Sequence, residues 1–432
     1  MTLPRTRKWL FGLGLFLGLM ALIWIVVARL LPSDEALAQR AAAELEQALG
    51  VKVSVGALHW QLRPVPALVM ENIATLQPQP IVIKKLTAQL NLAALLQRRV
   101  KVDSAEIEGA VLPQLSLPAL GGKPGAVQGP YRLGVEEVPL AHLVFRDVSW
   151  ITRYGVAIVF AGEVDFDAGW RPRQAMLRRP DFAPATDLSL TRQAQEDRWA
   201  VRINLGGGTA HGELQLQTRD QGRLQLSGKL QPRGIEVASA LSAFNRTPII
   251  SGKASGSTTL SASGQTVIQL AQSVHTQTTF TMGRSALLRF DLDKAMRSAG
   301  QERAGKTPLD AVSGQLDTQN TAKGMVVNLT HVKAKSGALN VSGQAKLAQR
   351  QVDAEFAVDL VDGVVGVPLR LSGPMNHVKV SVPPGALAGA AIGTAVLPGV
   401  GTAIGARVGA TLGKIFSPEP APKSSSTSKK QP

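Results

Sequence analysis

The chain has 432 residues, of which 44% are hydrophobic and 18% charged, which excludes wholesale disorder and allows one or more domain cores. The formal net charge is +16, but the basic residues are dispersed and only 4% of residues are aromatic, which argues against a nucleic-acid partner. Anionic lipid head groups and simple solubility stay open as reasons for the charge. The absence of cysteine excludes disulfides and thiol chemistry, and it leaves the compartment open.

Residues 9–31, WLFGLGLFLGLMALIWIVVARLL, form an apolar run with one charge, Arg29. As a helix rising about 1.5 Å per residue, this run reaches roughly 34 Å and can cross a hydrocarbon core of about 30 Å. Arg29 can extend to the interface, and Trp9 and Trp24 are the candidate interfacial aromatic residues. The rival interpretation is a cleaved signal peptide, whose apolar region is normally about 7–15 residues. We therefore expect an uncleaved transmembrane anchor.

The charges around this run predict its orientation. Three basic residues lie in 1–8, whereas Asp34 and Glu35 follow the run. The positive-inside rule then predicts a cytoplasmic basic tip at 1–8 and export of everything beyond the run. In a bacterium, the expected location is the inner membrane, crossed once, with the body in the periplasm.

Residues 34–49, DEALAQRAAAELEQAL, predict a short amphipathic helix. Ser33 is the expected N-cap, the acidic residues suit the positive end of the helix dipole, and Gly50 is the expected stop. The apolar side of the helix would contain Leu37, Ala41, Leu45, Ala48 and Leu49.

From residue 50 to about 384, short runs with an apolar residue at every second position are separated by polar, Pro and Gly residues. This pattern predicts a mainly β, antiparallel-rich region with a few short helices, at 235–244 and 291–299. The run TVIQLAQSV at 266–274 is expected to be a strand. The Pro/Gly-rich residues 111–130 are expected to form an exposed loop or linker, where a domain break could fall.

Eight Ser-Gly dipeptides lie between residues 227 and 373, most of them at the end of or inside an alternating run. Glycine there permits a positive φ, a β-bulge or a close backbone approach. Two arrangements stay open: repeated strand units in an elongated sheet, and ordinary hairpin turns in a compact sandwich.

The order of these features resembles the AsmA-like family of envelope proteins from Gram-negative bacteria, over about residues 9–382. Besides the anchor and the short helix, the matching stretches are Leu49–Val53, Leu58-His59-Trp60, Pro64-Val65-Pro66, Ile235-Glu236-Val237, Ile250–Gly256, Asp291–Lys294 and Leu339–Lys346. The resemblance implies an elongated, curved β-sheet with an apolar groove. Larger relatives are similar to bridge-like lipid transfer proteins, which are implicated in moving phospholipid between membranes.

An apolar groove suits lipid movement because an acyl chain in water is opposed by about 0.8 kcal/mol per CH₂. The alternative for each candidate groove residue is a closed core. About 20 strands at roughly 4.8 Å would make a ladder of no more than about 100 Å, so whether one copy can bridge two membranes stays open. The candidates are Leu224, Leu226, Leu339, Val341, Phe356, Val358 and Leu360.

A second apolar segment, residues 385–416, has glycines at every fourth position in each half, divided by Pro398-Gly399. On a helix, such a glycine zipper permits close approach of another helix in lipid, and each half is too short to span a bilayer. Shallow insertion into a membrane (the outer membrane among them), contact with an envelope partner protein, a packed cap on the sheet and a flexible tail stay open. Residues 417–432 have the composition of a disordered tail. The zipper glycines are Gly385, Gly389, Gly393, Gly401, Gly405, Gly409 and Gly413.

We find no sequence pattern for catalysis. The six histidines make no metal-ligand spacing, Gly252-Lys253 lacks the upstream glycines of a phosphate loop, and no nucleophile elbow is present. No enzyme activity, metal or cofactor is therefore expected. The expected function is binding or conduction of phospholipid or another envelope lipid by an inner-membrane-anchored periplasmic protein. The alternative is a non-enzymatic assembly or regulatory factor in outer-membrane protein biogenesis.

Overall fold

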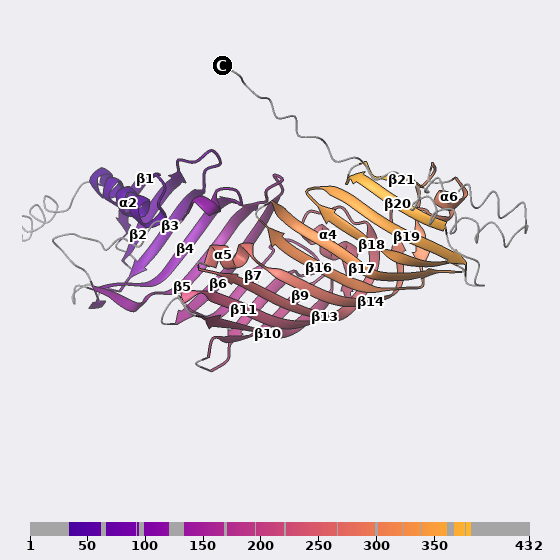
Figure 1. The fold of residues 1–432 in the computed structure, drawn as a ribbon. Coiled ribbons are helices and arrows are strands. Elements are labelled where there is room, and N and C mark those ends of the chain that lie inside the picture. Colours follow the sequence, from indigo (N-terminus) through magenta and orange to yellow (C-terminus); the bar gives the residue numbers. More distant parts are fainter. Residues whose placement is uncertain are drawn as a thin grey trace, which may run out of the picture. The chain divides into compact units, whose positions relative to one another are not determined.

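The chain is mainly β with a few short helices, as the alternating pattern predicts (Figure 1). It divides into two compact units, Met1–Arg171 and Pro172–Pro432, which we describe one at a time. Among the residues given below, no helix has the length and apolarity needed to cross a membrane. The predicted anchor at 9–31, glycine zipper at 385–416 and tail at 417–432 lie outside them. The computed structural model describes residues 34–61, 66–91, 93–94, 99–120, 134–167, 171–194, 196–219, 222–265, 267–298, 301–321, 323–337, 339–360, 367–375 and 377–381.

The first unit begins with helix α2 (Asp34–Leu49), which has the predicted bounds. Its apolar side packs on strand β1 (Val53–Gln61), with Ala38 buried. Gly50 ends the helix in the left-handed conformation, at φ 73°, and its N–H donates to the Glu46 carbonyl at 2.8 Å. The amphipathic helix and its glycine stop are thus confirmed.

The sheet of the first unit follows chain order from β1 to β6. All its neighbouring strands are antiparallel except β4 and β5, which are parallel, so the chain must cross between Pro113 and Gly134. The prediction of an exposed loop at 111–130 is wrong at its start, because residues 111–113 end strand β4 and Pro113 and Ser116 are buried, whereas 121–130 lie outside the described residues. Beyond β1, its strands are β2 (Ala67–Thr75), β3 (Val82–Leu90), β4 (Arg99–Pro113), β5 (Gly134–Ile151) and β6 (Ala157–Asp167), with a 3₁₀ turn, η1 (Leu117–Ala119), after β4.

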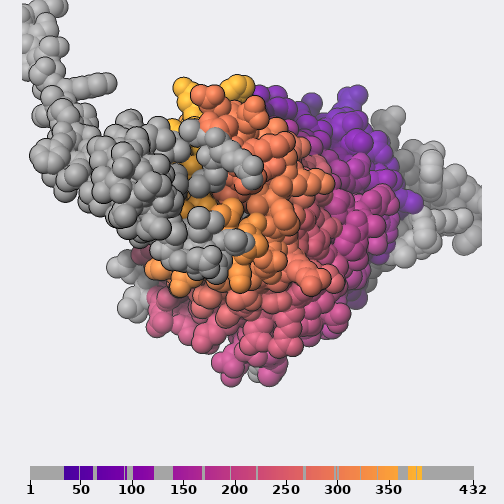
Figure 2. Space-filling view, turned by 90° about the vertical axis from the view of Figure 1, so that its right-hand side faces the viewer, coloured from indigo at the N-terminus to yellow at the C-terminus, as the bar shows by residue number. Residues whose placement is uncertain are grey.

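In the second unit, antiparallel neighbours follow one another from β7 to β21, with the short β12 and β15 lying beside the ends of β13 and β14. Figure 2 shows the surface of its last strands, β16 to β21, in orange to yellow. The strands are β7 (Arg171–Arg178), β8 (Asp187–Arg192), β9 (Arg198–Leu205), β10 (Gly208–Thr218), β11 (Leu224–Arg233), β12 (Ile235–Glu236), β13 (Ile250–Gly264), β14 (His275–Leu287), β15 (Thr307–Leu309), β16 (Ala311–Thr321), β17 (Gly324–Ser336), β18 (Leu339–Ala348), β19 (Gln351–Leu360), β20 (Val367–Pro374) and β21 (Lys379–Ser381).

Where the structure describes the second unit, three short helices connect its strands. Helices α4 (Val237–Ala243) and α6 (Leu292–Arg297) lie within the two predicted helical segments. The prediction of a strand at 266–274 is wrong, because this segment contains helix α5 (Val267–Gln272). Thr266, Val267 and Ile268 favour a strand by propensity, but burial of Leu270 and local hydrogen bonds outweigh this preference.

Those local hydrogen bonds tie both ends of α5 to the chain around it. The Gln265 N–H donates to the Gln269 Oε1 at 2.8 Å. At the other end, the Ser273 hydroxyl donates to the Ser263 carbonyl at 2.7 Å and accepts from the Ser263 N–H at 2.8 Å. The helix is therefore fixed against the last residues of β13.

The Ser-Gly dipeptides follow the two faces of this sheet. Glycine lies on the side of the half-buried apolar residues, and serine lies on the opposite, polar side. Glycine there leaves room for a large neighbour on the next strand: a Cβ at Gly314 would lie 3.2 Å from the Phe280 Cζ. A Cβ at Gly343 would meet the main-chain oxygen of Glu355 and the ring of Phe356. The clearest examples are Ser227-Gly228, Ser255-Gly256, Ser313-Gly314 and Ser342-Gly343.

A methyl group at Gly343 should therefore destabilise the second unit. We expect Gly343→Ala to lower the free energy of unfolding by about 1–3 kcal/mol, because overpacking forces a strand or a side chain to move. Ser342→Ala, on the exposed face of the same strand, should change it by less than about 0.5 kcal/mol. Urea denaturation of both variants measures the difference, and equal effects would contradict the crowding at Gly343.

Candidate functional site

One face of the second unit's sheet is lined by half-buried, mostly aliphatic side chains, and we call it the apolar face. Two rows of directly opposed residues cross it near the middle of the strands, and we call them the central rows. All their members are half-buried except Ala354, which is buried. The first row is Leu230, Thr258, Thr278, Leu316, Leu329, Ala345, Ala354 and Leu371. The second row is Leu214, Gly228, Leu260, Thr276, Thr318, Val327, Leu347, Val352 and Gly373.

The threonines in these rows bond to each other across neighbouring strands. The hydroxyls of Thr258 and Thr278 lie 2.9 Å apart, and those of Thr276 and Thr318 lie 2.6 Å apart. A hydroxyl that is already hydrogen-bonded to another hydroxyl has a smaller desolvation cost when water leaves the surface. The threonine pairs therefore do not prevent the apolar face from accepting an apolar ligand.

At β13, short helices lie at both ends of the apolar face. At the end where β13 begins and β14 ends, Val237 of α4 packs against a buried cluster of Met282, Leu309 and Val312. At the opposite end, α5 lies against β11 and β13, with Leu270 buried (Figure 1). The central rows lie between these covered ends.

The predicted groove residues Leu224 and Leu226 lie on β11, half-buried on the apolar face, close to α5. Leu226 is directly opposite Leu216 on β10 and Ala262 on β13. Leu224 is opposite Gly264, and a Cβ at that glycine would lie 2.6 Å from the main-chain nitrogen of Leu270 in α5.

The other five predicted groove residues lie together on β18 and β19. Leu339 is opposite Leu360, Val341 is opposite Val358, and Phe356 is opposite Gly343. Val358 is buried in a cluster with Leu292 of α6 and Leu369 of β20, against which Leu339 and Val341 also pack. The structure therefore places Leu339, Val341 and Val358 beneath α6.

The register places both groups on the same face, with β18 five strands from β11 and thus about 25 Å away at roughly 4.8 Å per strand. The central rows connect them. The predicted residues do not include Leu316, Val327 or Leu329, although Val327 and Leu329 alternate in the run GMVVNLTHV. Leu316 lies in the polar stretch SGQLDTQ, where only its register opposite Leu329 indicates its place.

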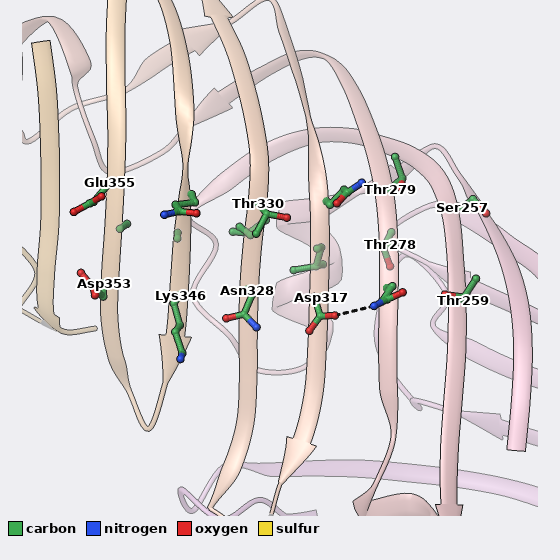
Figure 3. A pocket seen from close by; sticks show the side chains of 17 residues that line it. Ser257, Thr259, Thr278, Thr279, Asp317, Asn328, Thr330, Lys346, Asp353 and Glu355 are labelled. Atoms are coloured by element: carbon green, nitrogen blue, oxygen red, sulfur yellow. Dashed lines mark hydrogen bonds between the residues drawn. The ribbon is translucent and has the colours of Figure 1, made fainter. Parts of the chain in front are cut away.

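The opposite face of the same strands is polar and contains an open pocket of about 880 Å³. Figure 3 shows Asp317, Asn328, Lys346 and Asp353 in one line across neighbouring strands. Each is directly opposite the next in the sheet register. Hydroxyl, amide and charged side chains of this face line the pocket, together with Leu316, Leu329, Ala345 and Ala354 of the first central row. The two faces differ in polarity because the side chains alternate along each strand.

Beside this pocket, Asp317 accepts hydrogen bonds from two residues of β14. The His275 Nε2 lies 2.7 Å from the Asp317 Oδ2, and the Gln277 amide donates to the same oxygen at 3.4 Å, the dashed line in Figure 3. The hydrogen bond from His275, with its charge and the bonds from Gln277 and Asn328, lowers the pKa of the Asp317 carboxyl below its ordinary value of 3.8, although burial opposes the shift.

A carboxyl whose pKa is lower in the folded protein stabilises the fold above its unfolded-state pKa. This contribution is lost as the pH falls through the folded-state pKa, so the relevant window lies below about pH 4. We expect Asp317→Asn and His275→Gln each to flatten the fall in stability with pH across that window. Urea midpoints measured between about pH 5 and pH 2 test this prediction. A slope identical to that of the unchanged chain would contradict it.

In the part of the chain that the structure describes, no group of three or more His, Asp or Glu side chains is arranged to hold a metal ion. The candidate site is therefore the apolar face of the second unit's sheet, whose opposite face is polar.

Comparison with known proteins adds one feature. Residues 384–418 match a family model described as a glycine zipper. The match covers the predicted zipper glycines from Gly385 to Gly413 and none of the β-sheet strands. No curated protein and no solved structure matches the chain.

Proposed function

We propose that this protein binds phospholipid or another envelope lipid through the acyl chain, on the apolar face of its second unit. The observation that carries the proposal is the pair of central rows, where aliphatic side chains from β10 to β20 stay half-buried. Helices α4 and α6 cover one end of this face, and α5 covers the other end at β11 and β13. Apolar surface left in contact with water is a source of binding free energy, at about 25 cal/mol per Å² covered.

The direction of the central rows suits a long, flexible ligand. They run across the strands rather than along them, and an acyl chain placed there would meet aliphatic groups from successive strands. Each CH₂ that leaves water contributes about 0.8 kcal/mol, and the mutually bonded threonines add little desolvation cost. In the proposal, the lipid head group stays in water at the rim of the sheet.

The expected cellular setting belongs to the same proposal. The apolar run at 9–31 would anchor the chain in a bacterial inner membrane, with the sheet in the periplasm. The glycine-zipper match at 384–418 supports contact with an envelope membrane or a partner protein at the other end of the chain. A curved, AsmA-like groove that conducts lipid between membranes is the fullest form of this proposal.

A transfer assay tests the proposal directly. Donor vesicles containing fluorescent phospholipid are mixed with unlabelled acceptor vesicles, with and without the purified full-length chain. We expect the chain to accelerate transfer, because a desolvated apolar face lowers the cost of moving an acyl chain through water. Absence of both acceleration and stable lipid binding would contradict the proposal.

The glycine-zipper match also favours a second candidate, a factor in outer-membrane protein assembly that acts through residues 384–418. This candidate needs no lipid on the apolar face. Removal of 384–418 should abolish its activity while lipid binding by the sheet is unchanged, whereas lipid conduction requires the apolar face itself.

A further inference from the structure

One end of the first unit's sheet carries an apolar surface that the lipid-binding proposal does not use. Four segments meet there: the start of β1, the β2–β3 turn, the segment after β4, and the β5–β6 turn. The sheet register brings them together, because Val53 is opposite Thr75, Pro113 is opposite Ile151, and Ile151 is opposite Ala157. We call this surface the loop end, made of residues 51–53, 75–82, 113–120 and 151–157.

Large apolar side chains at the loop end are exposed to solvent. Leu76 is 68% exposed, Leu115 47% and Tyr154 41%, each from a different segment. Pro78 and Pro118 are also exposed beside them in the chain. Isolated exposed leucines are ordinary, but apolar residues from three adjacent loops form a patch of the kind that marks an interaction site.

Hydrogen bonds between the loops hold this patch in place. The Leu76 N–H donates to the Lys52 carbonyl at 2.9 Å, and the Gln114 N–H donates to the Ile151 carbonyl at 2.8 Å. The Gln77 amide donates to the Ser116 carbonyl at 3.3 Å. Ser116, a buried polar residue, donates its hydroxyl to the Gln79 carbonyl. The loops therefore lose little further conformational entropy when the patch is covered.

The charges at the loop end have one sign. Its four segments contain Lys52 and Arg153 and no aspartate or glutamate. Lys52 is exposed. Exposed leucine and tyrosine side chains beside the exposed Lys52, with no carboxylate among them, match the interfacial layer of an anionic bilayer. There, apolar groups reach the acyl boundary and cations meet lipid phosphates. An anionic membrane would repel carboxylates at the loop end, whereas a soluble protein partner could accept them.

We propose that the loop end of the first unit docks on an anionic phospholipid membrane, with Leu76, Leu115 and Tyr154 inserted into the interface. This contact is separate from the apolar face of the second unit, so either can fail without the other. Docking of the loop end would hold this end of the first unit's sheet against the membrane surface.

The absence of cysteine makes a direct test possible, since any introduced cysteine is unique. Leu76→Cys, Leu115→Cys and Tyr154→Cys each receive an environment-sensitive fluorophore on the full-length chain. The chain is reconstituted in phosphatidylcholine vesicles with phosphatidylglycerol and a quencher-bearing lipid. Met176→Cys, at a 42% exposed position on the polar face of the second unit, opposite Ser189, is the matched control. We expect quenching at the three loop-end positions but not at position 176.

A second variant gives the size of the effect. Leu76→Asp together with Leu115→Asp should weaken the contact reported by a fluorophore at Tyr154→Cys about tenfold per leucine replaced. These leucines are exposed, so circular dichroism and the melting temperature should stay unchanged. Quenching no stronger than at position 176, equal quenching without phosphatidylglycerol, or crosslinking of the loop-end cysteines to a protein instead of lipid would each overturn the proposal.

Discussion

Replacing Leu316 and Leu329 together with arginine is expected to lower the phospholipid that co-purifies with the full-length chain about tenfold or more, since about 1.4 kcal/mol is tenfold and burying a charge against an acyl chain costs more than that. The two leucines lie directly opposite each other on β16 and β17, half-buried in the first central row. Both arginines would place a charge where the proposed acyl chain lies. Lipid extraction and mass spectrometry measure the change.

The same two strands provide a matched control. Gln315 and Thr330 are also directly opposite each other, but their side chains lie on the polar face, where they line the pocket. Gln315→Arg with Thr330→Arg adds the same charge to the same strands and should leave the bound lipid unchanged. An equal loss in both double variants, with both chains folded by circular dichroism, would contradict a lipid site on the apolar face.

The second large effect is expected at Leu292 of α6. Leu292 is buried against Val358 and Leu369, so Leu292→Ala should lower the free energy of unfolding of the second unit by about 2–5 kcal/mol. Leu292→Ala removes methyl and methylene groups and leaves a cavity, into which the neighbouring strands can collapse only partly. Urea denaturation followed by fluorescence or circular dichroism measures the loss.

Leu292→Ala also distinguishes a closed cluster from a mobile cover. Lys294→Ala, at an exposed position of the same helix, should change the free energy of unfolding by less than about 0.5 kcal/mol. If α6 packs permanently over Leu339, Val341 and Val358, the free energies of unfolding of the two variants will differ by the full cost of the cavity at Leu292, about 2–5 kcal/mol. A loss at Leu292 no greater than at Lys294 would mean that the cluster beneath α6 is not closed in solution.

Much of the fold can be predicted from the sequence, because local patterns determine it. The alternation in the β strands, the amphipathic pattern of 34–49 with its glycine stop, and the short helices α4 and α6 all depend on neighbours within a few residues. Helix α5 was not predictable by propensity, because the β-branched residues at its start favour a strand. Its helical form depends on Leu270 and on Ser263, which is ten residues from its bonding partner Ser273.

The site is less predictable than the fold, since alternation reports which residues share a face but not what covers that face. Leu226 and Val341 have the same local pattern, yet Val341 packs against a buried cluster beneath α6 and Leu226 lies on β11 beside α5. The parallel pairing of β4 with β5 and the meeting of four loops at the loop end depend on contacts between distant segments. No single stretch of sequence contains that information.

Site-specific photocrosslinking shows whether lipid lies on the apolar face of the second unit. A photoreactive amino acid is placed singly at positions 316 and 329 on the apolar face, and at 315 and 330 on the polar face, of the full-length chain in membranes. We expect phospholipid adducts at 316 and 329 and none at 315 and 330. Absence of lipid adducts at 316 and 329, or equal adducts at all four positions, would contradict the lipid-binding proposal.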